Sequence, residues 1–229
     1  MNKILVSTDR IKKNYYNKDK KLRVLDDVSI DIKTGDLVAL VGPSGSGKSS
    51  LLHILGLIEK PTSGKIKLFG EDLNKLSNKE KDIIKQKKIS IIFQNNNLLE
   101  DFTALENILM PLIIRGENIK ISRTKANKFL KLVKLEMRSN HFPSELSGGE
   151  QQRVAIARSL VAETDLILAD EPTGNLDYRT SNDIFSYFIK LKKMKKTIIF
   201  ATHNRELANK ADYKLSISQG IIKRVNAKT

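Results

Sequence analysis

The sequence contains no cysteine among its 229 residues. It therefore has no disulfide, no thiolate metal ligand and no catalytic thiol, which fits a reducing compartment. It also lacks an apolar run near the ~18 residues that a membrane-spanning helix needs. The longest candidate, residues 37–58, is interrupted by glycines, a proline and Lys48. Residues 1–16 lack the apolar core of a signal peptide. We therefore expect the chain to reach a membrane only through a partner.

The formal net charge of +15 suggests two kinds of partner, a nucleic acid or an anionic membrane surface. The charge comes mostly from lysines spread along the chain, and no aromatic residues interleave with a basic stripe. This pattern favours a compositional bias over a nucleic-acid site, and leaves a weak attraction to acidic lipid headgroups open. The hydrophobic content of 40% is ordinary for a globular chain of one large domain, with or without an inserted subdomain.

Hydrophobic periodicity predicts strands that alternate with helices around a helical block at residues 95–162. The pattern predicts an α/β core of parallel strands with a helical subdomain inserted into it. We expect strands at 23–32, 36–41, 65–70, 89–94, 165–170, 197–202 and 213–218, and helices at about 48–57, 77–88, 103–114, 123–135, 149–162 and 180–193.

The stretch GPSGSGKS, residues 42–49, fits the pattern G-x-x-x-x-G-K-[ST] of a phosphate-binding loop. Its glycines let the backbone curl so that N–H groups point at phosphate oxygens. Lys48 is expected to reach the terminal phosphates, and the Ser49 hydroxyl is a candidate ligand for Mg²⁺. A strand before the loop and a helix after it supply the context that this motif requires.

Two acids follow the apolar strand LILA near residue 170. An aspartate at the carboxyl end of a strand near a phosphate loop can hold Mg²⁺ through its water shell, and Asp170 is the candidate. Glu171 is the candidate for positioning the attacking water and accepting its proton. The alternative interpretation is that these two acids are an ordinary surface pair at a strand end. The presence of a phosphate loop in the same chain favours the functional interpretation.

A second glycine-rich helix start, LSGGE, lies at residues 146–150. Helix N-termini offer free N–H groups and the positive pole of the helix dipole to an anion. The chain thus has a phosphate loop, a glutamine at a strand end, LSGGE, LILADE, GNLD and a histidine after a strand, in that order. With this order of motifs, the chain resembles the ATP-binding subunits of ABC transporters over nearly its full length.

The resemblance implies an ABC-type P-loop NTPase fold with a parallel sheet, an N-terminal antiparallel β subdomain and an inserted helical subdomain. It implies one nucleotide-binding domain over residues 1–229, with its core at about 1–94 and 163–229 and the helical subdomain at about 95–162. In this family two cassettes pack head to tail, and each LSGG segment binds the γ-phosphate held on the other subunit. Many relatives have LSGGQ in place of LSGGE.

The resemblance also implies ATP and Mg²⁺ as cofactors. Gln94 is implied to contact Mg²⁺ and the attacking water, His203 to contact the γ-phosphate, and Tyr15 to stack on adenine, with Tyr16 as the alternative. His53 and His141 are interpreted as structural. The implied catalytic residues are Glu171, His203 and Gln94, the implied metal ligands are Ser49, Gln94 and Asp170, and the implied nucleotide contacts are Tyr15, Gly42, Pro43, Ser44, Gly45, Ser46, Gly47, Lys48, Ser49, Ser50, Ser147, Gly148, Gly149 and Asp177.

The sequence of residues 95–116, 143–160 and 168–177 is most similar to that of the family members that power lipoprotein release from the inner membrane. Peptide and macrolide exporters and a cell-division ATPase share many of these residues. The resemblance implies a second copy of the chain and two transmembrane permease subunits as partners, at the cytoplasmic face. Leu98, Leu99 and Phe102 are the expected exposed anchors for the permease.

The alternative function is that of the ABC ATPases that act on nucleic acid. Those proteins carry a second cassette, a long coiled coil or an insert, none of which is visible in this sequence.

Overall fold

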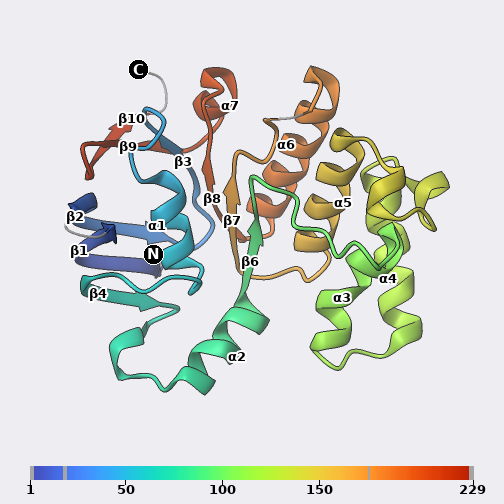
Figure 1. Ribbon diagram of the computed structural model, residues 1–229, viewed down its shortest axis with the longest axis horizontal. Coiled ribbons are helices and arrows are strands. Elements are labelled where there is room, and N and C mark those ends of the chain that lie inside the picture. Colours follow the sequence, from blue (N-terminus) through green and yellow to red (C-terminus); the bar gives the residue numbers. More distant parts are fainter. Residues whose placement is uncertain (1–2, 18–19, 175, 227–229) are drawn as a thin grey trace.

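The structure is a computed structural model that describes residues 3–17, 20–174 and 176–226. Two sheets and the helices around them form the molecule (Figure 1). The strands are β1 Ile4–Asn17, β2 Lys20–Lys33, β3 Leu37–Val41, β4 Ser63–Leu68, β5 Glu71–Asp72, β6 Ile89–Ile92, β7 Leu166–Asp170, β8 Thr197–Ala201, β9 Tyr213–Ser218 and β10 Ile221–Asn226. The α-helices are α1 Lys48–Leu55, α2 Asn78–Lys88, α3 Ala104–Ile114, α4 Ile119–Leu132, α5 Gly148–Leu160, α6 Tyr178–Lys193 and α7 Arg205–Asn209, and short 3₁₀ turns lie at Leu73–Lys75, Glu136–Arg138 and Pro143–Glu145.

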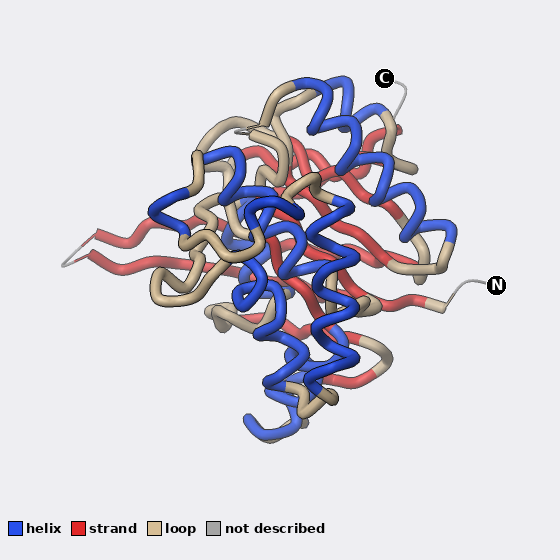
Figure 2. The backbone as a smooth tube through the Cα atoms, turned by 90° about the vertical axis from the view of Figure 1, so that its right-hand side faces the viewer, coloured by secondary structure: helices blue, strands red, loops and turns tan. Residues whose placement is uncertain are grey.

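The larger sheet has six strands in the order β10-β9-β3-β8-β7-β6. All neighbouring pairs from β9 to β6 are parallel, and β10 alone runs antiparallel to its neighbour β9. The smaller sheet is antiparallel, in the order β2-β1-β4-β5. Its long β1–β2 hairpin projects away from the rest of the molecule (Figure 2).

The central strands β3, β7 and β8 of the larger sheet are buried on both faces, as expected for parallel strands. Side chains alternate along each strand, so neighbours enter different cores. In β3, Val38 and Leu40 pack with α1 and the smaller sheet, whereas Leu37 and Ala39 pack with the helices on the other side. Figure 1 shows α1 on one side of this sheet and α5 and α6 on the other. The middle residues of β3, β7 and β8 are all apolar, and polar side chains such as Asp170 lie at the ends of these strands.

The sequence-based fold class is confirmed: the structure has a parallel sheet, an antiparallel N-terminal sheet and an inserted block of helices. Ser77 caps α2 through a reciprocal pair with Glu80, at the predicted helix start. Some details differ. The sequence pattern does not predict β1, β5, β10 or α7. In addition, β6 ends two residues before Gln94, and α4 begins at Ile119, four residues before the predicted start.

Asn107 fixes the segment that enters the helical block. Its side chain is fully buried, accepts a hydrogen bond from the Leu99 amide at 2.9 Å, and donates to the carbonyls of Leu99, Phe102 and Thr103 at 3.0, 2.9 and 3.1 Å. Residues 99–103 therefore have a defined conformation although they form no helix or strand.

The predicted exposed anchors of this segment are only partly correct. Leu99 and Phe102 are 40% and 38% exposed. Leu98, however, is half-buried against the core of the helical block, so the expectation that it is an exposed anchor was wrong. Leu105, Ile108 and Leu112, which share one face of α3, are all buried. No helix in the described part of the chain is both long and apolar enough to cross a bilayer.

We expect Asn107→Leu to lower the free energy of unfolding by about 3 kcal/mol. The substitution leaves the buried partners in residues 99–103 without hydrogen bonds, at about 1–3 kcal/mol for each unsatisfied group. Denaturant unfolding, followed by circular dichroism, measures this loss. Asn127→Leu, on the exposed face of α4, is the matched control and should change stability little. An equal effect of the two substitutions would contradict the role of Asn107.

Candidate functional site

The predicted chemical residues meet at the carboxyl ends of the parallel strands. The phosphate loop follows β3, Gln94 follows β6, Asp170 ends β7 and His203 follows β8. Ligands of open α/β sheets bind at this edge. A cavity of about 340 Å³ opens there. The predicted residues that line it are Tyr15, Ser44, Gly45, Gly47, Lys48, Ser49, Ser50, Gln94, Asp170, Glu171 and His203.

The phosphate loop leads into a helix without a side-chain cap. Gly47 is the N-cap residue of α1, with a φ of 103°, and no side chain accepts a hydrogen bond from the first turn. A Cβ atom at Gly47 would lie 2.8 Å from Leu25 and 2.9 Å from the Val24 carbonyl, so glycine is required both by the backbone conformation and by the space. The first N–H groups of α1 thus point into the cavity with no competing acceptor.

Lys48 is buried, with 7% of its surface exposed, and donates to the carbonyls of Gly42 and Pro43 at 2.9 and 3.0 Å. Its ammonium group therefore lies across the mouth of the loop. Gly42, Pro43 and Ser46 do not line the cavity. They belong to the loop that shapes it, and a Cβ atom at Gly42 would lie 2.2 Å from the Ile217 carbonyl.

Asp170 and Glu171 line the same cavity, and the backbone changes between them, because Glu171 has a left-handed φ of 46°. Asp170 is buried at the end of β7. The Glu171 carboxylate lies 3.3 Å from the Nε2 atom of His203 and accepts a hydrogen bond from the His203 amide at 3.4 Å. Burial raises the pKa of Glu171, and the nearby His203 and Lys48 oppose this effect. The carboxylate is therefore more basic than an ordinary glutamate.

Ser49, Gln94 and Asp170 line the same cavity and offer a hydroxyl, an amide oxygen and a carboxylate. These are the hard oxygen donors that Mg²⁺ accepts, usually with only one or two protein ligands and the phosphates of a substrate completing the shell. Within residues 3–17, 20–174 and 176–226, no three histidine or acidic side chains gather as a self-sufficient metal site. The arrangement thus fits an ion that arrives with a phosphate ligand.

Of the two candidate aromatic residues, only Tyr15 lines the cavity. It is 38% exposed, whereas Tyr16 is 68% exposed. Burial and the hydrogen bond that its hydroxyl donates to Glu59 raise the pKa of Tyr15. His53 and His141 lie outside the cavity: His53 contacts Glu59, and His141 contacts Arg138.

The second glycine-rich helix start lies away from this cavity. Ser147 and Gly148 are exposed, and a Cβ atom added at Gly148 would meet no atom within 4 Å. Ser147 caps α5: its hydroxyl accepts from the Glu150 amide at 3.3 Å, and Glu150 accepts from the Ser147 amide at 2.8 Å. Asp177 is also exposed and caps α6 through Thr180. Within one chain, Ser147, Gly148, Gly149 and Asp177 therefore do not line the site.

Arg158 is a residue that the sequence analysis missed. It lies on α5, the helix that begins at Ser147, and donates to the carbonyls of Asn96 and Asn97 at 2.8 Å each. Burial lowers its pKa. The arginine thus ties the segment directly after Gln94 to α5. An arginine in a helical pattern ordinarily indicates a solvated face, so no sequence signal pointed to this contact.

This geometry defines a class of protein: a phosphate-loop ATPase with a second, external glycine-rich helix start. A sequence model described as ABC transporter matches residues 25–174, and the chain belongs to this family. It is an ATP-binding and ATP-hydrolysing cassette. It is similar to the lipoprotein-releasing system ATP-binding protein LolD of Rickettsia bellii, with 44% identity over 96% of this chain and 98% of that protein. LolD of Legionella pneumophila is 42% identical, over 96% of this chain and 97% of the relative.

Solved structures give the same assignment. A dimeric bacterial ABC transporter cassette superimposes with a TM-score of 0.94, at 35% identity, over 98% of this chain and 100% of that chain. A post-hydrolysis dimer of an ATP-binding cassette, bound to ADP and Pi, matches with the same TM-score, identity and coverage.

Proposed function

We propose that this chain is the ATPase subunit of an inner-membrane transporter that releases lipoproteins towards the outer membrane. The similarity to LolD proteins over nearly the whole length of both chains supports this cargo. In this proposal, the chain is a peripheral subunit at the cytoplasmic face and forms a homodimer bound to two permease subunits. MacB-type exporters and FtsE-like complexes were the alternatives from sequence, and the relatives described above favour lipoprotein release.

ATP is proposed to lie in the cavity at the strand ends, with adenine against Tyr15 and the phosphates on the loop. The free N–H groups of α1 and the Lys48 ammonium stabilise the negative phosphate oxygens. Lys48 exchanges its two carbonyl partners for phosphate oxygens. Ser49, Asp170 and Gln94 are proposed to hold Mg²⁺, which would neutralise charge on the terminal phosphates.

Glu171 is proposed to be the general base. Its carboxylate accepts a proton from a water whose oxygen attacks the γ-phosphorus, and ADP leaves as the bond from its β-phosphate oxygen breaks. The burial that raises the pKa of Glu171 strengthens it as a base. His203, in contact with Glu171 at 3.3 Å, is proposed to orient the carboxylate and to contact the γ-phosphate.

The exposed LSGG segment is proposed to complete the site of a second copy. Ser147, Gly148 and Gly149 lie outside the cavity of their own chain and are open to a partner. In a head-to-tail dimer with two-fold symmetry, each such segment contacts the γ-phosphate on the other chain, and Asp177 lies near the seam. The dimeric state of the two solved cassettes described above supports this arrangement.

The permease is proposed to dock over a groove of about 470 Å³ between β6, α2 and α3. Its apolar lining includes Phe93, Leu99, Met110 and Ile114, and Leu99 and Ile114 are 40% and 62% exposed. Phe102, also exposed, follows Leu99 in a turn closed by a backbone hydrogen bond of 3.2 Å. An exposed apolar groove beside a rigid, hydrogen-bonded segment is a suitable docking surface.

Glu171→Gln should reduce ATP hydrolysis by about 10²- to 10⁴-fold, the usual worth of a general base. It should leave ATP binding intact, because the amide keeps the size of the carboxylate. Turnover and equilibrium ATP binding measure the two effects. Glu163→Gln, an exposed glutamate near the other end of β7, is the control. Near-normal turnover in Glu171→Gln would exclude this residue as the base.

Lys48→Ala and Ser147→Arg should each abolish hydrolysis for different reasons. The first weakens phosphate binding in its own chain, and the second places a bulky side chain in the dimer seam while the monomer still binds ATP. Mixing the two inactive variants should restore part of the activity, because a mixed dimer holds one intact site. The ATPase rate of the mixture measures this restoration, and Thr124→Arg on α4 is the control. Loss of ATP binding in Ser147→Arg monomers would contradict the trans arrangement.

Phe102→Ala and Leu99→Ala should weaken the complex with the permease and uncouple hydrolysis from transport. The isolated subunit should keep its fold and its ATP binding. Recovery of permease subunits on the tagged protein from detergent-solubilised membranes measures the interaction. Met194→Ala removes a side chain that is 62% exposed at the end of α6 and serves as the control. Wild-type recovery and transport for both variants would place the docking surface elsewhere.

A further inference from the structure

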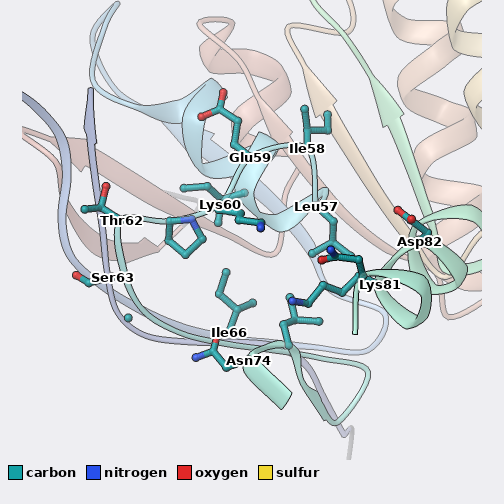
Figure 3. Close-up of a pocket in the computed structure, with 15 residues that line it drawn as sticks. Leu57, Ile58, Glu59, Lys60, Thr62, Ser63, Ile66, Asn74, Lys81 and Asp82 are labelled. Carbon is teal, nitrogen blue, oxygen red and sulfur yellow. The ribbon is translucent and has the colours of Figure 1, made fainter. Parts of the chain in front are cut away.

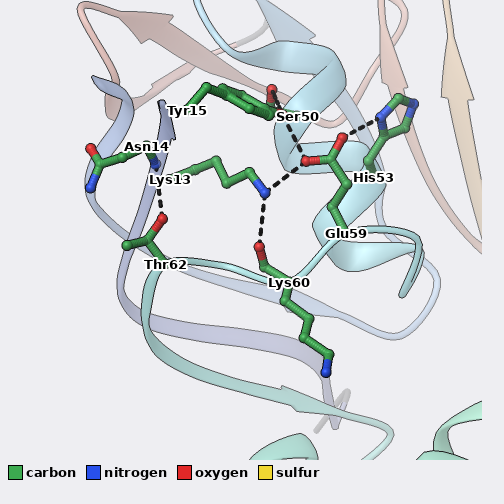
Figure 4. Close-up of polar contacts among 8 residues, drawn as sticks. All are labelled: Lys13, Asn14, Tyr15, Ser50, His53, Glu59, Lys60 and Thr62. Atoms are coloured by element: carbon green, nitrogen blue, oxygen red, sulfur yellow. Dashed lines mark hydrogen bonds and ion pairs between the residues drawn. The ribbon is translucent and has the colours of Figure 1, made fainter. Parts of the chain in front are cut away.

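Glu59 connects the turn after α1 to the aromatic residue of the nucleotide cavity. The Tyr15 hydroxyl donates to the Glu59 carboxylate at 2.6 Å and lies 3.2 Å from the Ser50 hydroxyl (Figure 4). The same carboxylate pairs with Lys13 at 2.9 Å and with the Nδ1 atom of His53 at 3.3 Å. Three side chains from β1 and α1 thus converge on one acid.

The network also holds the backbone of β1 on both sides of Lys13. The Thr62 amide donates to the Lys12 carbonyl at 2.8 Å, and the Asn14 amide donates to the Thr62 hydroxyl at 2.9 Å. The Lys13 ammonium donates to the Lys60 carbonyl at 3.0 Å and lies 4.8 Å from the centre of the Tyr15 ring. One face of the ring is therefore covered by a cation, and both ends of the tyrosine are fixed.

The protonation states suit this arrangement. Burial alone would raise the pKa of Glu59, but the hydrogen bonds from Tyr15, Lys13 and His53 outweigh it and lower the pKa. Burial and the bond to Glu59 raise the pKa of Tyr15. At neutral pH the glutamate is thus an ionised acceptor and the tyrosine a neutral donor, which is the stronger, charge-assisted type of hydrogen bond.

Glu59 does not line the nucleotide cavity. It lines a separate cavity of about 700 Å³ below α1, together with Lys60, Asn74 and Asp82 (Figure 3). Any effect of Glu59 on the nucleotide must therefore pass through Tyr15 or through α1. The direct hydrogen bond to the phenol favours the route through the ring.

We propose that Glu59 is a positioning residue for base recognition: it holds the Tyr15 ring at a fixed tilt, with Lys13 on one face and the other face open to adenine. The inference rests on the proposed stacking of Tyr15 on adenine. A ring ordered before binding loses less conformational freedom when the base arrives, so the network increases affinity without touching the nucleotide.

The test compares ATP with inorganic tripolyphosphate, which has no base, on the purified full chain with Mg²⁺. Tyr15→Phe and Glu59→Ala should each raise the Kd for ATP about fivefold, which corresponds to about 1 kcal/mol. Glu59→Ala, which changes no residue of the nucleotide cavity, should leave the Kd for tripolyphosphate and the kcat at saturating ATP unchanged. The double variant should bind ATP no more weakly than either single variant, because both remove one interaction. Glu59→Gln, which keeps an acceptor, should lie between Glu59→Ala and the wild type.

Asp82→Asn removes an acid from the same cavity wall without touching Tyr15 and is the matched control. If Tyr15→Ala binds ATP as the wild type does, the stacking proposal itself is wrong. If Tyr15→Ala weakens ATP binding but Tyr15→Phe and the Glu59 variants do not, stacking stands and the positioning role of Glu59 is wrong. If Glu59→Ala weakens the binding of ATP and of tripolyphosphate equally, Glu59 acts through α1 and the phosphate loop and not through the Tyr15 ring.

Discussion

Burial of the parallel sheet on both faces is the constraint on which the rest of the structure depends. Side chains from β3, β7 and β8 alternate between two apolar cores, and the middle positions of these strands are all apolar. Polar chemistry is confined to the strand ends, where Asp170, Gln94 and His203 meet the phosphate loop. The site is precise because the strands that carry it are fixed by packing on both sides.

This constraint explains why much of the site could be predicted from the sequence. Lys48 follows a glycine-rich loop and Asp170 ends an apolar strand. Both patterns consist of a few consecutive residues, so the positions of these two side chains can be predicted from their neighbours in the sequence. The contacts of Asn107, Arg158 and Glu59 could not be predicted in this way. Each joins segments distant in the chain or lies where a polar residue has several ordinary interpretations, and only the folded chain brings the partners together. The strand β1 could not be predicted for a similar reason, since its mixed polar and apolar residues are ordered by pairing with β2 and β4.

Polar contacts also join the helical block to the elements around it. Arg115, at the end of α3, donates to the carbonyls of Gln86 and Ala162 at 2.9 and 2.7 Å, and Arg158 holds the segment after Gln94. Hydrogen bonds of this kind can rearrange at lower cost than an interdigitated apolar core. The block shares an apolar core with the sheet and also has polar contacts to α2 and to the segment after Gln94. A change at Gln94 therefore has a direct connection to the helix that begins at Ser147.

The two glycine-rich helix starts differ in one respect with a kinetic consequence. The first turn of α1 has no side-chain acceptor, whereas α5 already satisfies one of its N–H groups through Ser147. On its own chain, a phosphate would find the N–H groups of the first turn of α1 without a side-chain acceptor. On the proposed partner, one N–H group of the first turn of α5 is already bonded to Ser147. In the proposed dimer, the contact within one chain would therefore be the stronger one and the contact between chains the weaker one. The contact between chains would depend on one terminal phosphate, so the closed dimer would open after that phosphate is released.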